Sequence, residues 1–284
     1  MIDKGVFIDL VNDYVNRGAK NYVDKKTALA PELEGLRIFD EPLIGFAAAD
    51  DEDFIKLKSE KAVGSHFLLP RDWNNSAKTV ISIFCPFTRR IKDSNKAVSG
   101  LPSFEWLHGR IEGQAFLADL LRRLQAFLEG EGYKTAVPCL DPRFSQKSPY
   151  SDNSREQGFY TSNWSERHVA FTAGLGTFGL SRGLITPRGI AGRIGSLITE
   201  AFFEADPKIP KKLYENCLFC GRCVSNCPVE AISLKDGKKH PPCSDFLDAV
   251  KEKFNPWYGC GKCQVNVPCE NGIPPALAAG KAQS

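Results

Sequence analysis

The alternation of apolar and polar residues divides the first half of the chain into helices and strands. Apolar side chains recur at helical spacing between residues 6 and 18, which predicts an amphipathic helix. A second apolar stripe runs through residues 112–129 and is followed at once by glycines that favour a helix end. Residues 44–49 and 79–87 are short runs rich in apolar or β-branched side chains. They predict two buried strands.

The second half alternates in the same way before its composition changes. The predicted elements are a strand at residues 134–138, a helix at residues 162–173, and two strands joined by a turn at residues 183–187 and 193–203. Ser162 or Asn163 is the expected N-cap of that helix. Proline and lysine dominate residues 205–212, which is typical of a linker. We therefore expect an α/β domain over residues 1–208 and a second domain over residues 209–284.

Composition and charge are those of an ordinary globular protein. Hydrophobic residues make up 42% and charged residues 25% of the 284 positions. The net charge of +3 is too small to indicate a nucleic-acid or membrane surface as partner. The first twenty residues interleave aspartates with apolar residues, unlike a signal peptide, and no run approaches the roughly 18 apolar residues of a membrane span. We expect a cytoplasmic protein with no membrane partner, whose thiols stay reduced and free to bind metal.

Four closely spaced cysteines begin the C-terminal part. The motif is Cys217-x2-Cys220-x2-Cys223-x3-Cys227-Pro228. In bacterial ferredoxins this run places its first three thiolates on one [4Fe-4S] cluster and its fourth on another. Zinc is the alternative metal, but zinc ribbons use two separated Cys-x2-Cys pairs instead of three evenly spaced thiols before Cys-Pro. The motif therefore predicts iron–sulfur clusters.

Four further cysteines complete the ligands for a second cluster. They are Cys243 and the run Cys260-x2-Cys263-x5-Cys269. By the crossing pattern of dicluster ferredoxins, we assign Cys217, Cys220, Cys223 and Cys269 to one cluster and Cys227, Cys243, Cys260 and Cys263 to the other. The x5 gap before Cys269 is longer than usual. The remaining cysteines, Cys85 and Cys139, are expected to be structural thiols.

Two segments of the α/β part resemble known families. AGLGTFGLSRGLITPRGIAGRIGSLITE (173–200), followed by the two-cluster block, resembles the epoxyqueuosine reductases and the reductive dehalogenases, and RDWNNSAKTVISIFCPFT (71–88) is similar to the strand that leads into the epoxyqueuosine reductase core. The resemblance implies a nitroreductase-like mixed α/β domain followed by a bacterial dicluster ferredoxin domain. It also implies base-off cobalamin, with the nearer cluster feeding electrons to cobalt.

The resemblance further implies a cofactor-binding loop. Its residues would be Ala173, Gly174, Leu175, Gly176, Gly179, Thr186 and Gly189. Glycines permit close approach of the backbone to a flat ligand, but the same glycines can cap a helix and form a tight turn. The context argues against a dinucleotide site, because the G-x-G-x-x-G pattern here follows a predicted helix instead of opening one after a strand.

The expected proton donor departs from the epoxyqueuosine reductase pattern. Tyr160 stands where that family has a catalytic aspartate, and reductive dehalogenases use a tyrosine as proton donor. Arg167 and His168 lie within two helical turns and would stabilise the tyrosinate. The alternative is structural: Tyr160 packs as an aromatic ring, and Arg167 and His168 are surface residues of a helix.

These observations predict a cobalamin-dependent iron–sulfur reductase. It would take electrons from an external donor such as ferredoxin or flavodoxin and act on a small-molecule or nucleoside substrate, with nucleic acid a partner only if the substrate is a tRNA base. One alternative is an electron-transfer or corrinoid-reactivating protein without a substrate of its own. Another is a flavin-dependent reductase, because nitroreductase-like folds bind FMN.

Overall fold

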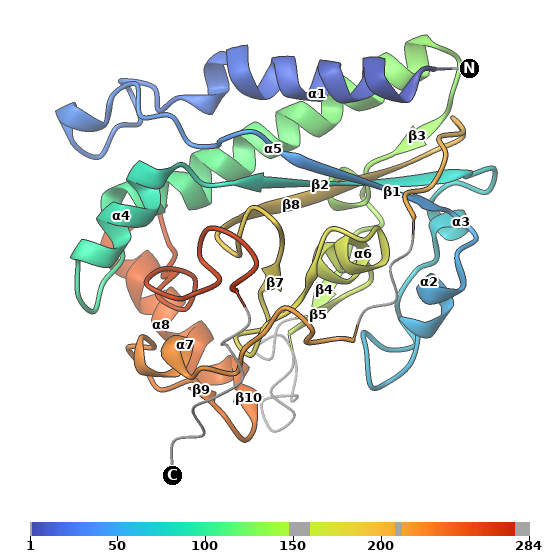
Figure 1. Ribbon diagram of the computed structural model, residues 1–284. Helices are drawn as coiled ribbons and strands as arrows, with labels where there is room; N and C mark the ends of the chain where they lie inside the picture. Colours follow the sequence, from blue (N-terminus) through green and yellow to red (C-terminus); the bar gives the residue numbers. More distant parts are fainter. Residues whose placement is uncertain (1, 148–159, 208–211, 276–284) are drawn as a thin grey trace.

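A computed structural model describes residues 2–147, 160–207 and 212–275. Its centre is a four-stranded antiparallel sheet (Figure 1). The strands, in spatial order, are β1 (Leu43–Ala48), β2 (Thr79–Pro86), β8 (Gly192–Thr199) and β3 (Thr135–Ala136). Every residue of β2 is buried, as expected for an inner strand with both faces covered.

Side chains alternate between the two faces of the sheet, and helices cover both faces (Figure 1). The helices on one face are α1 (Lys4–Arg17) and α5 (Phe104–Gly130); those on the other are α2 (Glu52–Lys56), α3 (Pro70–Trp73) and α6 (Glu166–Thr172). Ile81 joins the core under α1 and α5, whereas its neighbour Val80 joins the core around Trp164. The result is a layered α/β domain with two apolar cores.

Short elements complete the chain. They are η1 (Ala19–Asn21), η2 (Pro31–Leu33), α4 (Arg89–Ala97), η3 (Pro138–Leu140), β4 (Gln146–Lys147), β5 (Thr161–Ser162), β6 (Thr177–Phe178), β7 (Leu184–Ile185), α7 (Arg222–Ser225), β9 (Ile232–Ser233), β10 (Gly237–Lys238) and α8 (His240–Phe254). Elements α7 to α8 and the cysteine loops form the C-terminal part, which lies beside α4 (Figure 1).

The sequence-based prediction of α6 was wrong about where the helix begins. It begins at Glu166 with Ser165 as N-cap, two to three residues later than expected. Ser162 belongs to β5, and Asn163 is bound to the segment before β4: its Nδ2 donates to the carbonyl of Arg143 at 2.8 Å. A tertiary contact therefore overrides the local capping preference.

Two strand predictions also differ from the structure. The strands predicted at residues 183–187 and 193–203 do not pair with each other: β7 pairs with β6, and β8 pairs with β2 and β3. The strand predicted at residues 134–138 ends at Ala136, because Pro138 begins η3. The predicted domain boundary at residue 208 and most of the polar loop after residue 147 lie outside the described residues.

None of the helices in the described ranges is long and apolar enough to cross a membrane.

Candidate functional site

The first four-cysteine group lines a single cavity. Its cysteines are Cys217, Cys220, Cys223 and Cys269, and Cys263 borders the same cavity. Ile185, Ile190 and Val267 pack against three of these cysteines. Burial and, to a smaller extent, the nearby Cys217 sulfur raise the pKa of Cys269 to about 12. The four cysteines that the sequence assigned to one cluster thus line one cavity, which they share with Cys263, and their ligation of a cluster stays a prediction.

The second group lies next to the first. Burial raises the pKa of Cys260 to about 12, and the sulfurs of Cys263, Cys243 and Cys227 add to the rise. Sulfurs that repel one another's charge in this way lie close together. Cys263, however, also lines the cavity of the first group and raises the pKa of Cys223, so the division of the cysteines between two clusters stays a prediction. Iron would have to displace the protons from these thiols on binding. Ligation itself stays a prediction.

The local backbone suits clusters held by thiolates. Gly221, between Cys220 and Cys223, has φ 72°, a left-handed conformation that favours glycine, and it is the N-cap of α7. The amide of Ala231 donates to the sulfur of Cys227 at 3.2 Å. Amide donors of this kind stabilise cluster sulfurs and tune their potential. The donor set therefore fits [4Fe-4S] clusters.

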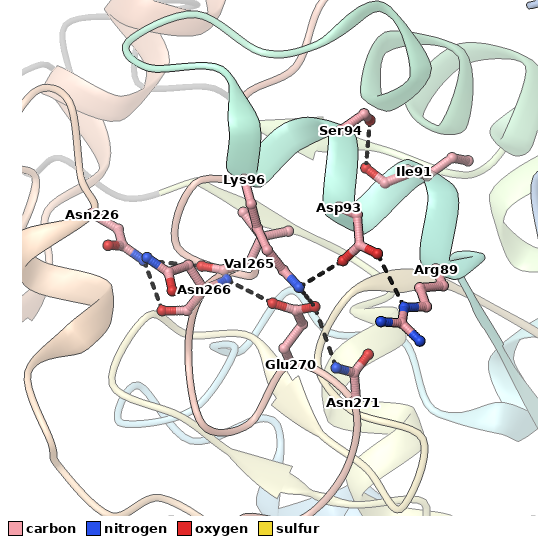
Figure 2. Close-up of polar contacts among 10 residues, drawn as sticks. All are labelled: Arg89, Ile91, Asp93, Ser94, Lys96, Asn226, Val265, Asn266, Glu270 and Asn271. Carbon is pink, nitrogen blue, oxygen red and sulfur yellow. Dashed lines mark hydrogen bonds and ion pairs between the residues drawn. The ribbon is translucent and has the colours of Figure 1, made fainter.

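An ion pair holds the first group to the α/β domain (Figure 2). Glu270, which follows Cys269, is only 4% exposed. It accepts from Lys96 of α4 at 2.7 Å and from the amide of Asn266 at 2.6 Å. Gly189 packs on the same segment, where a Cβ would lie 2.0 Å from the Glu270 carbonyl oxygen. Nothing in the sequence pattern singled out this contact, because a single lysine and glutamate carry no spacing signal.

The second group is held by α4 and α5. Lys262 donates to the carbonyl of Asn95 at 2.6 Å, and Asn95 Nδ2 donates to the carbonyl of Cys260 at 3.0 Å. Gly261, at φ 68°, lies so close to Trp106 that a Cβ would be 1.9 Å from its ring. The loop between Cys260 and Cys263 therefore requires glycine at this position.

Two of the three predicted catalytic residues, Tyr160 and Arg167, lie close enough for the charge of each to affect the pKa of the other. Tyr160 stacks on His240 with ring centroids 5.3 Å apart, and its hydroxyl donates to Gln146. Burial raises the pKa of Tyr160, while the positive charges of Arg167 and Arg110 oppose the rise. Arg167 in turn faces Cys263 and Tyr160. Arg167 thus supplies a positive charge between Tyr160 and the second cysteine group.

His168 lies elsewhere on the same helix. Its ring is 4.8 Å from that of Phe178, and its Nδ1 is 2.7 Å from Ser165 Oγ. Burial, with a smaller contribution from Arg167, lowers the pKa of His168 to about 4. At neutral pH the imidazole is uncharged, so Arg167 and not His168 carries the charge that the tyrosine hypothesis requires.

The predicted cofactor loop follows α6. Gly174 is exposed, with φ 77°, and no atom lies within 4 Å of the position that a Cβ would occupy there. By contrast, a Cβ at Gly176 would lie 2.3 Å from the carbonyl oxygen of Ile185, so packing alone requires that glycine. Ala173, Leu175, Gly179, Thr186 and Gly189 are all buried. Gly174 is the open position of the loop, and cofactor contact stays a prediction for all seven residues.

Sequence reasoning missed several polar residues near Arg167. Arg110 of α5 donates to the hydroxyl of Tyr258 at 2.6 Å, and Arg193 of β8 donates through Nε to Gln114 at 3.1 Å. Lys238 lies next to Cys263 and Cys243. Arg110 and Gln114 are one turn apart on α5, so they share a face. The sequence alone does not reveal this face, because it becomes apparent only where α5, α6 and β8 pack together.

Comparisons with known proteins support this architecture. A model of the 4Fe-4S binding domain matches residues 210–233. Among solved structures, an epoxyqueuosine reductase crystallised with an epoxyqueuosine-modified tRNA-Tyr stem loop matches with a TM-score of 0.50 at 22% identity, over 84% of this chain and 64% of that one. A catabolic reductive dehalogenase matches with a TM-score of 0.51 at 14% identity, over 94% and 37% of the two chains.

The chain has the fold that these two groups of reductases share. The expected fold class, a mixed α/β domain followed by a ferredoxin-type iron–sulfur domain, is confirmed. The chain spans 64% of the length of the epoxyqueuosine reductases it matches. No curated protein matches it. At these identities the similarity to the epoxyqueuosine reductases and reductive dehalogenases establishes the fold alone.

Proposed function

We propose that the chain is an iron–sulfur reductase in which two [4Fe-4S] clusters carry electrons to a bound cobalamin for reductive chemistry on a small substrate. The observation that carries the proposal is the arrangement of the cysteines. One group reaches solvent at Cys220, and the other faces Arg167, which lies next to Tyr160. This order describes an electron path from the exposed Cys220, through the second group, to the side of that group on which Arg167 and the half-exposed Tyr160 lie.

The surface around Cys220 supports an external electron donor. Of the ten cysteines, all in the described part of the chain, Cys220 is the exposed one. Exposed apolar side chains surround this part of the chain, among them Leu213, Tyr214, Phe219 and Leu234. Electron-transfer encounters use small interfaces, and such a patch suits one. A ferredoxin or flavodoxin is therefore the proposed donor.

Cobalamin, when bound, supplies a cobalt centre that accepts electrons from a cluster and delivers them to the substrate. The residues that would hold it are those of the turn at Gly174, whose open side leaves room for a flat group. Arg167 would lie between this ligand and the second cysteine group. The fold shared with two groups of reductases supports a reductase role.

Tyr160 is the proposed proton donor. Its raised pKa keeps the hydroxyl protonated at neutral pH, and the neighbouring Arg167 stabilises the tyrosinate once the proton has left. His240, stacked on the ring, fixes the orientation of the phenol. The aromatic packing and the acid role are therefore compatible.

Anaerobic reconstitution tests the proposal. We expect about eight irons and eight sulfides per chain, from two cubanes, and a visible spectrum that shows retained corrinoid after cobalamin is added and the protein is desalted. Gly174→Val should weaken corrinoid retention, while Gly132→Val, another exposed glycine with positive φ, serves as the control. Iron and sulfide without corrinoid binding would contradict the cobalamin assignment, and a yellow extract with an FMN spectrum would replace it by a flavin.

A further inference from the structure

Asn226 connects two cysteine-bearing segments of the C-terminal part (Figure 2). We call residues 217–227 the N-terminal run and residues 260–269 the C-terminal run. Asn226 donates through Nδ2 to the carbonyl oxygen of Val265 at 2.9 Å and to that of Asn266 at 3.2 Å. In the described part of the chain, these are the hydrogen bonds that join one run to the other. One amide group therefore holds the two runs together.

Helix α7 fixes the backbone of Asn226. The Asn226 amide donates to the carbonyl of Arg222 at 3.1 Å, so this residue closes the last turn of the helix. Cys223 lies within α7, and Cys227 directly follows Asn226. In the predicted partition, Cys223 belongs to the first cluster and Cys227 to the second. A shift of Asn226 would therefore move ligands of both clusters.

The accepting carbonyls belong to the x5 segment of the C-terminal run, residues 264–268. Val265 is 2% exposed and packs in the core of the α/β domain. Val267 is 8% exposed and packs beside the first cysteine group. Asn266 lies between them with φ 53°, a left-handed conformation that asparagine tolerates better than most residues. The long x5 spacing thus accommodates a turn that places one valine in the α/β core and the other against the cysteines.

The C-terminal run is anchored to the α/β domain at this turn. Glu270 accepts from the amide of Asn266 at 2.6 Å and from Lys96 of α4 at 2.7 Å (Figure 2). Such a contact resists displacement, because a buried carboxylate that loses its charged partner is strongly destabilising. The carbonyls that Asn226 binds therefore belong to a fixed part of the molecule.

The N-terminal run is anchored to the α/β domain just before its first cysteine. Asn216 donates through Nδ2 to the carbonyl of Ile185 at 3.0 Å, and its amide donates to Thr177 Oγ1 at 2.9 Å. The opposite end of the run carries Cys227, and the side chain of Asn226 ties this end to the C-terminal run. Loss of that contact should let this end shift while both anchors stay in place.

We propose that Asn226 is a positioning residue that fixes the distance and orientation between the two clusters. This inference rests on the proposed function for the presence of two clusters. Each run supplies ligands to both clusters in the predicted partition, so the relative position of the runs sets the relative position of the clusters. Electron transfer from the first cluster to the second depends on that spacing, and a neutral amide maintains it without adding a charge beside either cluster.

Electron paramagnetic resonance of the anaerobically reconstituted chain, reduced with titanium(III) citrate, tests the proposal. Paramagnetic clusters that lie close together broaden and split each other's signals, so the spectrum of the fully reduced protein reports their spacing. We expect Asn226→Ala to retain about eight irons and to change this splitting, while the g values of each cluster, read after partial reduction, stay as in the parent. Iron release to a chelator should become about five-fold faster, an effect of the size of one hydrogen bond.

Two further variants separate positioning from a general loss of stability. Asn226→Gln retains the amide donor and should keep the splitting of the parent. Ser225→Ala is the matched control, because this exposed side chain donates within α7, to the carbonyl of Arg222 at 3.0 Å. Its replacement should leave the splitting and the rate of iron release unchanged.

Three results would overturn the proposal: the parent's splitting in Asn226→Ala with both clusters present, the same change in Ser225→Ala, or altered g values of one cluster with unaltered splitting, which would indicate a local effect at Cys227. If Asn226→Ala holds fewer than about eight irons, Asn226→Gln decides. The parent's splitting in that variant supports the proposal, and a loss of iron equal to that of the alanine variant contradicts it.

The parent protein shows separately whether the proposed function holds. Its iron content tests the two clusters, and corrinoid retention, read from the visible spectrum, tests the cobalamin assignment. The positioning role is read only from differences between the variants and the parent, so its failure is distinguishable from the failure of the proposed function.

Discussion

The two cysteine groups lie side by side but in opposite surroundings. The first packs on Ile185, Ile190 and Val267 and is open to solvent at Cys220. The second faces the positive charges of Arg167 and Lys238. Nearby cations stabilise the extra electron of a reduced cluster, whereas an apolar shell does not. If each group holds a cluster as proposed, the cluster of the first group should have the lower potential and that of the second group the higher.

Replacing single cysteine ligands should have the largest effect, and it tests whether the two cysteine groups hold separate clusters. Cys220→Ser should remove the first cluster, and Cys243→Ser the second, so that each variant retains about four irons after reconstitution. Iron and sulfide analysis, with electron paramagnetic resonance of the reduced protein, measures the result. The same experiment on Cys269→Ser tests the ligand that follows the long x5 spacing.

Cys139→Ser provides the control for ligand loss. Cys139 packs at the edge of the α/β core, and burial raises its pKa to about 12, as expected for a structural thiol. Its replacement should leave all eight irons in place. If Cys269→Ser also retained all eight irons, the assignment of Cys269 as a ligand would be wrong. If Cys220→Ser and Cys243→Ser gave identical spectra, the two groups would not hold distinct clusters.

The sequence allowed much of this arrangement to be predicted, because local spacing carries the information. The helical periods of α1 and α5 and the inner strand β2 all follow from patterns within a few residues. The start of α6 and the pairing of β7 were missed, since both depend on contacts with distant segments. For the same reason the hydrogen bonds of Arg110 with Tyr258 and of Arg193 with Gln114 could not be predicted from the sequence.

The ion pair between Lys96 and Glu270, which holds the first cysteine group to the α/β domain, should contribute strongly to stability. Lys96→Gln leaves Glu270 buried without its charged partner, which should lower the free energy of unfolding by about 3 kcal/mol. Asp93→Asn removes a partner of Lys96 that is 47% exposed and should cost less than about 1 kcal/mol. Anaerobic urea titrations followed by fluorescence measure both. Equal effects would mean that Glu270 does not anchor the first group.

Helix α6, which carries Arg167, has two residues whose pKa values are shifted in opposite directions. Burial raises the pKa of Glu166 to about 7, although a hydrogen bond from Ser196 lowers it in part. The native state then keeps a proton that the unfolded chain releases above about pH 4.5, so stability falls as the pH rises toward 7. His168, with its pKa lowered to about 4, does the reverse: stability rises between about pH 4 and 6.5.

Between pH 4.5 and 6.5 these two effects oppose each other. Glu166→Gln should therefore make stability rise with pH in this window, by up to about 1.4 kcal/mol per pH unit relative to the parent. His168→Gln should make it fall by a similar amount. Urea midpoints at several pH values give the slopes. If the plots of stability against pH are parallel for the parent and both variants, folding does not change the pKa of either group.

The smallest expected effect tests the potential difference directly. Lys238 lies on β10 beside the sulfurs of Cys243 and Cys263, so Lys238→Gln removes one positive charge from the second cluster. Reduction adds a negative charge, and without the lysine the reduced state loses a stabilising interaction of about 1 kcal/mol, or about 40 mV for one electron. Lys235→Gln, an exposed lysine of the same hairpin, is the matched control. Spectroelectrochemistry should show the second cluster shifted to lower potential in Lys238→Gln alone while the first stays unchanged. A shift confined to the first cluster would contradict the inferred order of potentials, because Lys238 would then influence the first cluster instead of the second.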